Sequence, residues 1–174
     1  MCGDGEDDRV SASERLSRAI ALCESGELEQ ALPLLLELRE ELPDDPQVAV
    51  QTAWVHDSLG LEQEAVPHYE AALAAGLPDG QARGAYLGLG STLRTLGRDV
   101  DSERVFREGI ERFPDSRPLR VFHAMLEYNL GRSREALRTL IEVLLEATDD
   151  PTILRYRRSL GAYAEDLDRS WLDT

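Results

Sequence analysis

The chain has 174 residues, of which 42% are hydrophobic and 30% are charged, and its formal net charge is −15 at pH 7. This length suits one domain with its own hydrophobic core. Ala, Leu, Glu and Arg dominate the composition, and because all four favour helices, we expect an all-α chain. No apolar run approaches the ~18–20 residues that a membrane span needs. An acidic protein repels phosphate backbones, so nucleic-acid binding is not expected either.

The charge is unevenly distributed along the chain. Residues 1–82 contain 4 Arg against 18 Asp and Glu, whereas residues 83–174 contain 15 Arg against 16 Asp and Glu. The acidic start lacks the basic and apolar regions of a secretory signal. We therefore expect residues 1–10 to be a disordered acidic tail on a cytoplasmic protein. Cys2 and Cys23 are the only cysteines, so no disulfide framework is expected, which fits a reducing compartment.

Glycine reveals an internal repeat, since four glycines recur 34, 37 and 34 residues apart. Each has a small residue seven positions before it and another five positions after it, and a larger apolar residue follows four positions later. We expect each repeat to be two antiparallel helices joined at a left-handed glycine, with the small residues at the helix crossing. We expect the larger residues to fill the seam to the next pair. The glycines are Gly26, Gly60, Gly97 and Gly131; the small residues are Ala19, Ala53, Gly90 and Ala124, then Ala31, Ala65, Ser102 and Ala136; the larger residues are Leu35, Tyr69, Phe106 and Leu140.

The predicted elements follow this register along the sequence. A capping box of Ser11 and Glu14 indicates the start of the first helix. Helix pairs are expected over about 13–43, 46–76, 82–114 and 117–148, within repeats of about 12–45, 46–82, 83–116 and 117–150. A ninth helix begins at Pro151 and runs to about Leu167, within a C-terminal segment 151–174. The prediction is thus an all-α, α-α superhelix of four helix pairs over residues 11–150 plus a C-terminal capping helix.

The third repeat carries a recognisable pattern, with Leu89-Gly90 followed by Ser102, Phe106 and Pro114. It resembles the tetratricopeptide repeat (TPR), whose pattern is W-x2-L-G-x2-Y…A-x3-F…P over 34 residues. The protein also resembles a small bacterial family, tetratrico peptide repeat group five. The runs that carry this second resemblance are Leu87–Arg94, Arg112–Asp115, Arg155–Arg158 and Tyr163–Asp168. The resemblance implies a TPR fold in an autonomous bacterial protein and no settled molecular function.

No catalytic or metal-binding motif stands out. His56, His68 and His123 lack the spacing of a metal set, and there is no Cys-x-x-Cys. There is also no nucleophile elbow and no phosphate-cradling glycine loop. His56 and His123 occupy positions that the repeat pattern buries, so we expect them in the core or at its boundary. The sequence therefore predicts no enzyme, no cofactor and no metal.

The resemblance implies that the first helices of the pairs line a concave groove, on the stripe spaced i, i+4, i+7. This stripe is mostly apolar, with arginines towards the C-terminal end, where we expect a partner to place an acidic group. One hypothesis is a scaffold that binds a peptide or helix of a partner protein in this groove. The alternative is a module that forms a homodimer through the groove or the repeat ends; the protein's own termini would also be able to fill the groove. The predicted groove residues are Val50, Trp54, Leu87, Ser91, Arg94, Met125, Tyr128, Asn129, Arg155 and Arg158.

Overall fold

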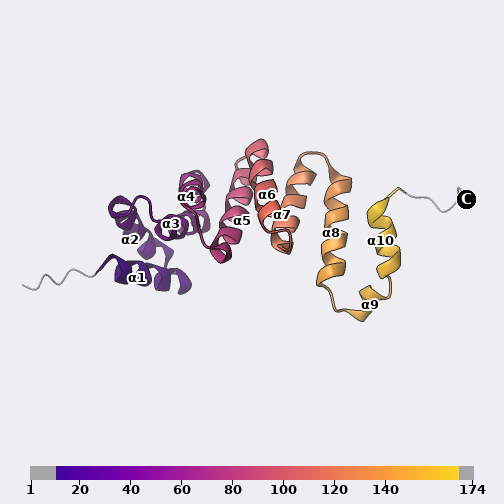
Figure 1. Ribbon diagram of the computed structural model, residues 1–174, viewed down its shortest axis with the longest axis horizontal. Coiled ribbons are helices and arrows are strands. Elements are labelled where there is room, and N and C mark those ends of the chain that lie inside the picture. Colours follow the sequence, from indigo (N-terminus) through magenta and orange to yellow (C-terminus); the bar gives the residue numbers. More distant parts are fainter. Residues whose placement is uncertain (1–10, 169–174) are drawn as a thin grey trace, which may run out of the picture. The chain divides into compact units, whose positions relative to one another are not determined.

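The computed structural model describes residues 11–168 of the protein (Figure 1). About 80% of these residues are helical and none of them is in a strand. The expected acidic tail, residues 1–10, lies outside the described residues. The protein divides into two compact units, Met1–Pro78 (unit 1) and Asp79–Thr174 (unit 2). No helix in the described part of the protein is both long and apolar enough to cross a membrane.

Unit 1 contains two helix pairs, α1 (Ala12–Glu24) with α2 (Leu28–Glu41) and α3 (Pro46–Ser58) with α4 (Glu62–Ala75). Helix α2 also packs on α3 and so joins the two pairs. The expected capping box is present at the start of α1, where the backbone N–H of Ser11 donates to Glu14 Oε2 at 2.9 Å. Such a box satisfies two N–H groups that the helix itself leaves unpaired.

Unit 2 contains α5 (Asp79–Thr95), α6 (Asp99–Arg112), α7 (Arg117–Asn129), α8 (Ser133–Ala147), α9 (Pro151–Leu154) and α10 (Arg157–Glu165). Helix α5 packs on α6 and α7, α7 packs on α8, and α10 packs on α8. The single ninth helix expected after Pro151 is interrupted. Tyr156 has φ −100° and ψ 7°, and its N–H donates to Ile153 O. This i to i−3 bond is a tighter turn than an α-helix makes, so α9 ends and α10 begins as a separate helix.

The four repeated glycines join the helices of each pair as expected. Their φ values are 81°, 73°, 70° and 77°, in the left-handed region. After Gly26 the N–H of Glu27 donates to Leu22 O at 2.8 Å, and after Gly97 the N–H of Arg98 donates to Leu93 O at 2.9 Å. This is the Schellman arrangement that ends a helix on a left-handed residue. The predicted junctions are therefore confirmed.

The small residues lie buried at the helix crossings. Ala19 and Ala53 have no exposed surface, and Ser102 Oγ donates to Gly90 O at 2.7 Å where α6 crosses α5. The expected seam is formed by Leu35, Tyr69 and Phe106, each at most 1% exposed. For the fourth repeat the expectation was wrong, because Leu140 on α8 is 39% exposed. Among the described helices, the nine-residue α10 packs against α8 beyond α7, and it leaves this side chain partly uncovered.

The run Arg112–Asp115 forms a clasp between α5 and α6. Phe113 is 3% exposed and lies under the guanidinium groups of Arg83 and Arg112, whose carbons are 4.7 Å and 5.1 Å from the ring centre. Arg112 Nη2 donates to Asp79 Oδ1 at 2.7 Å, and Arg83 Nη1 donates to Asp115 Oδ1 at 3.0 Å. Cation–π contacts of this kind stabilise by about 0.5–1 kcal/mol at exposed sites. The run Arg112–Asp115 thus has a structural role, because it holds α5 against α6.

Candidate partner-binding face

Three predicted groove residues share one stripe of α5. Leu87, Ser91 and Arg94 are spaced i, i+4 and i+7, and all three are half-buried. This spacing places them on the same side of the helix. The Arg94 side chain makes no hydrogen bond or ion pair with another described residue, so its guanidinium has donor capacity left.

Three further groove residues lie on α7, which packs on α5. Met125 is 42% exposed, Tyr128 is 69% exposed, and Asn129 is exposed. Pro118 stands seven residues before Met125, so the two share a helix face. We call the surface formed by the stripes on α5 and α7 the α5–α7 face. Its predicted members are Leu87, Ser91, Arg94, Met125, Tyr128 and Asn129.

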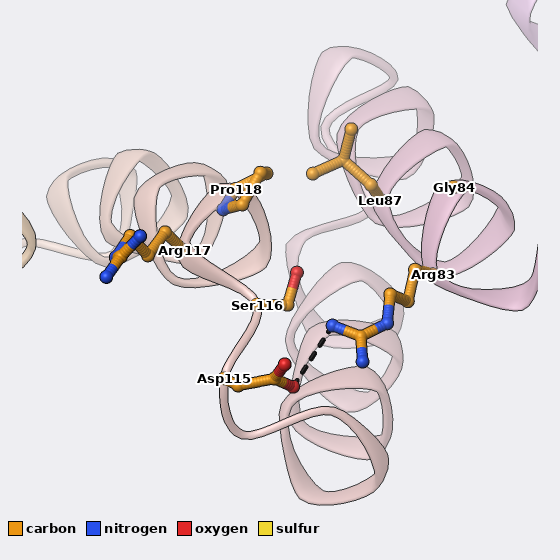
Figure 2. Close-up of a pocket in the computed structure, with 7 residues that line it drawn as sticks. All are labelled: Arg83, Gly84, Leu87, Asp115, Ser116, Arg117 and Pro118. Atoms are coloured by element: carbon orange, nitrogen blue, oxygen red, sulfur yellow. Dashed lines mark hydrogen bonds and ion pairs between the residues drawn. The ribbon is translucent and has the colours of Figure 1, made fainter. Parts of the chain in front are cut away.

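A pocket of about 480 Å³ opens between these two helices (Figure 2). Leu87 of α5 and Pro118 of α7 stand on opposite sides of it, and the hydroxyl of Ser116 points into the space between them. The ion pair of Arg83 with Asp115 lies at its edge. The complete lining is Arg83, Gly84, Leu87, Asp115, Ser116, Arg117 and Pro118.

The sequence prediction included only Leu87 of these lining residues. Extending the stripe on α5 by one helical turn towards the helix start reaches Gly84, and extending the stripe on α7 by two turns reaches Pro118, so the periodicity contained that signal. Ser116 had no such signal. Its position in the pocket depends on how the loop between α6 and α7 runs.

Four predicted residues lie elsewhere. Val50 and Trp54 belong to α3 of unit 1, where Trp54 is half-buried and Val50 has no exposed surface. Val50 therefore packs in the core and offers no surface to a partner. Arg155 and Arg158 are exposed. They belong to the segment that packs on α8, and Figure 1 shows α8 between α7 and α10. The structure does not bring these two arginines onto the α5–α7 face.

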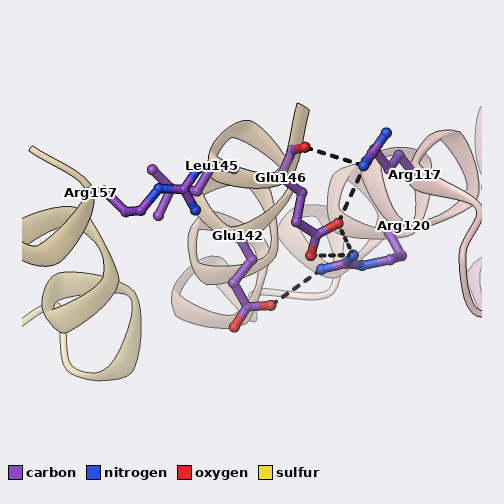
Figure 3. A network of polar contacts seen from close by, with 6 residues as sticks. All are labelled: Arg117, Arg120, Glu142, Leu145, Glu146 and Arg157. Atoms are coloured by element: carbon purple, nitrogen blue, oxygen red, sulfur yellow. Dashed lines mark hydrogen bonds and ion pairs between the residues drawn. The ribbon is translucent and has the colours of Figure 1, made fainter. Parts of the chain in front are cut away.

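A polar network ties α7 to α8 (Figure 3). Arg120 Nη1 donates to both carboxylate oxygens of Glu146 at 2.8 Å, and Arg120 Nη2 lies 3.5 Å from Glu142. The Arg120 hydrogen bond holds the pKa of Glu146 below its ordinary value, against the opposing effect of burial. Arg117 Nη2 donates to the backbone oxygen of Glu146 at 3.2 Å, so this guanidinium is directed towards α8. On the far side of α8, Arg157 donates to Leu145 O at 2.8 Å.

The three histidines pack against neighbouring rings. His56 is 6% exposed, its Nδ1 lies 2.9 Å from Thr52 O, and its ring stacks on His68 with centroids 5.1 Å apart. Burial, followed by the electrostatic influence of His56 and of Arg39, lowers the pKa of His68 from 6.5 to about 4. His123 packs edge-on against Phe106. In residues 11–168, no group of three or more His, Cys, Asp or Glu side chains is arranged to hold a metal ion.

Helix pairs joined at left-handed glycines, with small residues at every crossing, define an all-α helical-repeat protein of the TPR class. The model of the tetratrico peptide repeat family, group five, matches residues 46–167. The protein therefore belongs to this family, and the predicted fold class and family are confirmed. The matched region begins at α3 and includes both α5 and α7.

Solved structures support the same fold. MamA AMB-1 is 22% identical with a TM-score of 0.68, over 86% of this protein and 81% of that one. YrrB, described as a TPR protein with an unusual peptide-binding site, is 21% identical with a TM-score of 0.70, over 94% and 82%. A TPR protein from Parabacteroides merdae is 18% identical with a TM-score of 0.73, over 90% and 60%. No curated protein matches the sequence.

Proposed function

We propose that this protein is a non-catalytic scaffold that binds a peptide or helix of another protein on the α5–α7 face. The observation that carries the proposal is the pocket of about 480 Å³ between Leu87 and Pro118. Concave sites with apolar walls and a few polar groups are the usual form of a ligand site. The peptide-binding site named for YrrB, a similar structure, adds support.

The chemistry of the face suits an amphipathic segment. The pocket receives an apolar side chain, while Met125 and Tyr128, about two and three turns further along α7, are 42% and 69% exposed. The unbranched thioether of Met adapts to different partners, and Tyr often contributes strongly to binding free energy. Ser91 and Arg94 supply hydrogen-bond donors at the other end of the α5 stripe. Trp54 remains a prediction for the equivalent helix of unit 1.

The experiment starts with affinity capture on the full-length protein and identification of the captured partner. Calorimetry then compares the parent with Leu87→Ala and Met125→Ala. Truncating a central contact commonly costs about 1–2 kcal/mol, so we expect binding about five- to thirtyfold weaker for each variant. Val100→Ala is the matched control, because Val100 is an 82% exposed apolar residue on α6, outside the α5–α7 face. Melting curves establish that all variants are folded. Equal affinity for all four proteins would exclude the face as the binding site.

A second candidate is a homodimer formed through the repeat end. Leu137, Leu140 and Leu144 of α8 are 46%, 39% and 42% exposed, and their spacing of three and four residues puts them on one stripe. A second copy would be able to cover this stripe. Analytical ultracentrifugation over a wide concentration range tests it, with Leu144→Glu expected to abolish the dimer. A parent protein that stays monomeric at every concentration removes this candidate.

A further inference from the structure

Ser116 is an unpartnered polar side chain inside the pocket. The residue is 7% exposed and stands immediately before α7. Its hydroxyl makes no capping hydrogen bond and none with any other described residue. Figure 2 shows this hydroxyl directed into the space between Leu87 and Pro118. Because the residue is otherwise buried and its hydroxyl faces the pocket, a ligand atom in the pocket would be able to hydrogen-bond to it.

The first turn of α7 adds one backbone donor to the same site. The first hydrogen bond of this 13-residue helix runs from Arg120 N to Ser116 O at 3.3 Å. The N–H of Arg117, a residue that lines the pocket, precedes it and has no partner within the helix. Pro118 has no N–H, and Leu119 has no exposed surface, so neither can donate to a ligand. The positive end of the helix dipole favours an anion here. At α3 of the same protein, the Asp45 carboxylate fills such a position and accepts from two backbone N–H groups at 2.8 Å and 3.0 Å.

Arg83 brings a positive charge to the edge of the pocket. One of its donors, Nη1, is bound to Asp115 at 3.0 Å, and the carboxylate side chain is 71% exposed. A guanidinium has five N–H donors, so Arg83 keeps capacity for a second acceptor. Such exposed ion pairs contribute little stability, so a bound anion would be able to compete with Asp115.

We propose that this pocket is an anchor subsite for a carboxylate that neighbours an apolar side chain in the bound segment. The carboxylate accepts hydrogen bonds from Ser116 Oγ and the Arg117 N–H of α7, while Arg83 balances its charge. The neighbouring apolar side chain packs between Leu87 and Pro118. The inference rests on the proposed function of the α5–α7 face and gives that face its chemical specificity. An Asp or Glu residue and the C-terminus of a peptide carry the same group, and the test separates them.

The test is an NMR titration of the ¹⁵N-labelled full-length protein with four small probes. Acetyl-leucyl-aspartate amide carries a side-chain carboxylate, and acetyl-leucyl-asparagine amide is its neutral counterpart. Acetyl-alanyl-leucine carries a terminal carboxylate, and its amide is the neutral counterpart. The amide signal of Arg117 should shift and saturate, with at least one acid binding about tenfold more tightly than its counterpart, since a charged acceptor strengthens hydrogen bonds. The acid that binds more tightly identifies the source. Equal binding of acids and neutral probes, or no saturable shift at the Arg117 amide, overturns the proposal.

Ser116→Asp gives a second, independent test. The new side chain should cap α7 as Asp45 caps α3, and therefore exclude the acidic probe. We expect a melting temperature at or above that of the parent, together with at least tenfold weaker binding of the acidic probe. A folded Ser116→Asp protein with unchanged probe affinity contradicts the carboxylate subsite. Binding of the captured partner separates the two proposals. If Leu87→Ala weakens this binding and Ser116→Asp does not, the α5–α7 face is supported and the carboxylate subsite is refuted. If neither variant weakens it, the face is refuted as the binding site.

Discussion

Gly90 lies where α5 crosses α6, with the ring of Phe106 directly over it. A Cβ added to Gly90 would lie 2.7 Å from Cε1 and Cζ of that ring, whereas carbon atoms normally approach to about 3.5–4.0 Å. Phe106 has no exposed surface, so the ring has no open space to move into. Over-packing of this kind costs about 1–3 kcal/mol, and replacing Gly by Ala within a helix returns about 1 kcal/mol. We therefore expect Gly90→Ala to lower the free energy of unfolding by about 1 kcal/mol.

Gly161 provides a control in the same unit. It lies within α10, and no atom comes within 4 Å of a Cβ added there. Gly161→Ala should therefore raise the free energy of unfolding, by about 0.5–1 kcal/mol. Urea denaturation followed by circular dichroism measures both variants.

A double-mutant cycle then tests the mechanism. Phe106→Leu makes room for a Cβ at Gly90, so the combined loss should be smaller than the sum of the two single losses, by about 1 kcal/mol. The steric argument is refuted if Gly90→Ala is as stable as Gly161→Ala, or if the two losses simply add.

Three further outcomes are expected. Ala53→Leu should lower the free energy of unfolding by about 1–3 kcal/mol or more, because it over-packs the helix crossing. Ala75→Leu, at an exposed position, should change it by less than about 0.5 kcal/mol. Equal melting temperatures of the two variants would contradict the repeat register. Because the pKa of His68 is about 4 in the folded protein against 6.5 ordinarily, the unfolded state takes up a proton first as the pH falls between these values. Stability should then drop by roughly 1 kcal/mol from pH 7 to pH 5, after allowance for solvent screening, and His68→Asn should lack this drop in denaturation curves at the two pH values. Gly60→Ala should cost about 1 kcal/mol, because φ is +73° at this residue although a Cβ meets nothing within 4 Å; an unchanged denaturation midpoint would show that the left-handed junction carries no penalty.

The repeat register was predictable because it depends on local properties of single residues. Gly60 adopts a left-handed φ that a Cβ would penalise, and Ala53 allows two helices to approach closely. Both requirements recur at fixed spacing, so they were visible in the sequence. The interruption of the ninth helix was not visible in the same way, since neither Gly nor Pro marks Arg155 and Tyr156. The structure shows there a tight turn, with Arg157 of α10 bonded to Leu145 O of α8.

The binding face was only partly predictable. The position of a residue on a helical stripe fixes the direction of its side chain, but not how far neighbouring helices cover it. Val50 and Met125 both occupy the predicted stripe, yet Val50 is fully buried and Met125 is 42% exposed. The difference depends on the neighbours that cover each helix. The same reason explains why Leu140 was expected in a seam and is 39% exposed, since α10, the described helix that packs on α8 beyond α7, is short.

The sequence by itself therefore determined the helical class, the helix boundaries near each glycine and the residues at the crossings. These features follow from backbone preference and side-chain size, which are properties of each residue type in any fold. The tertiary structure alone decided that Ser116 turns an unpartnered hydroxyl towards Leu87 and Pro118 in a pocket beside Arg83. That arrangement brings together residues from α5, the loop before α7 and α7 itself, about 30 positions apart in the sequence. Their proximity arises from the packing of α5 on α7, because hydrophobic burial between helices acts across any separation in sequence.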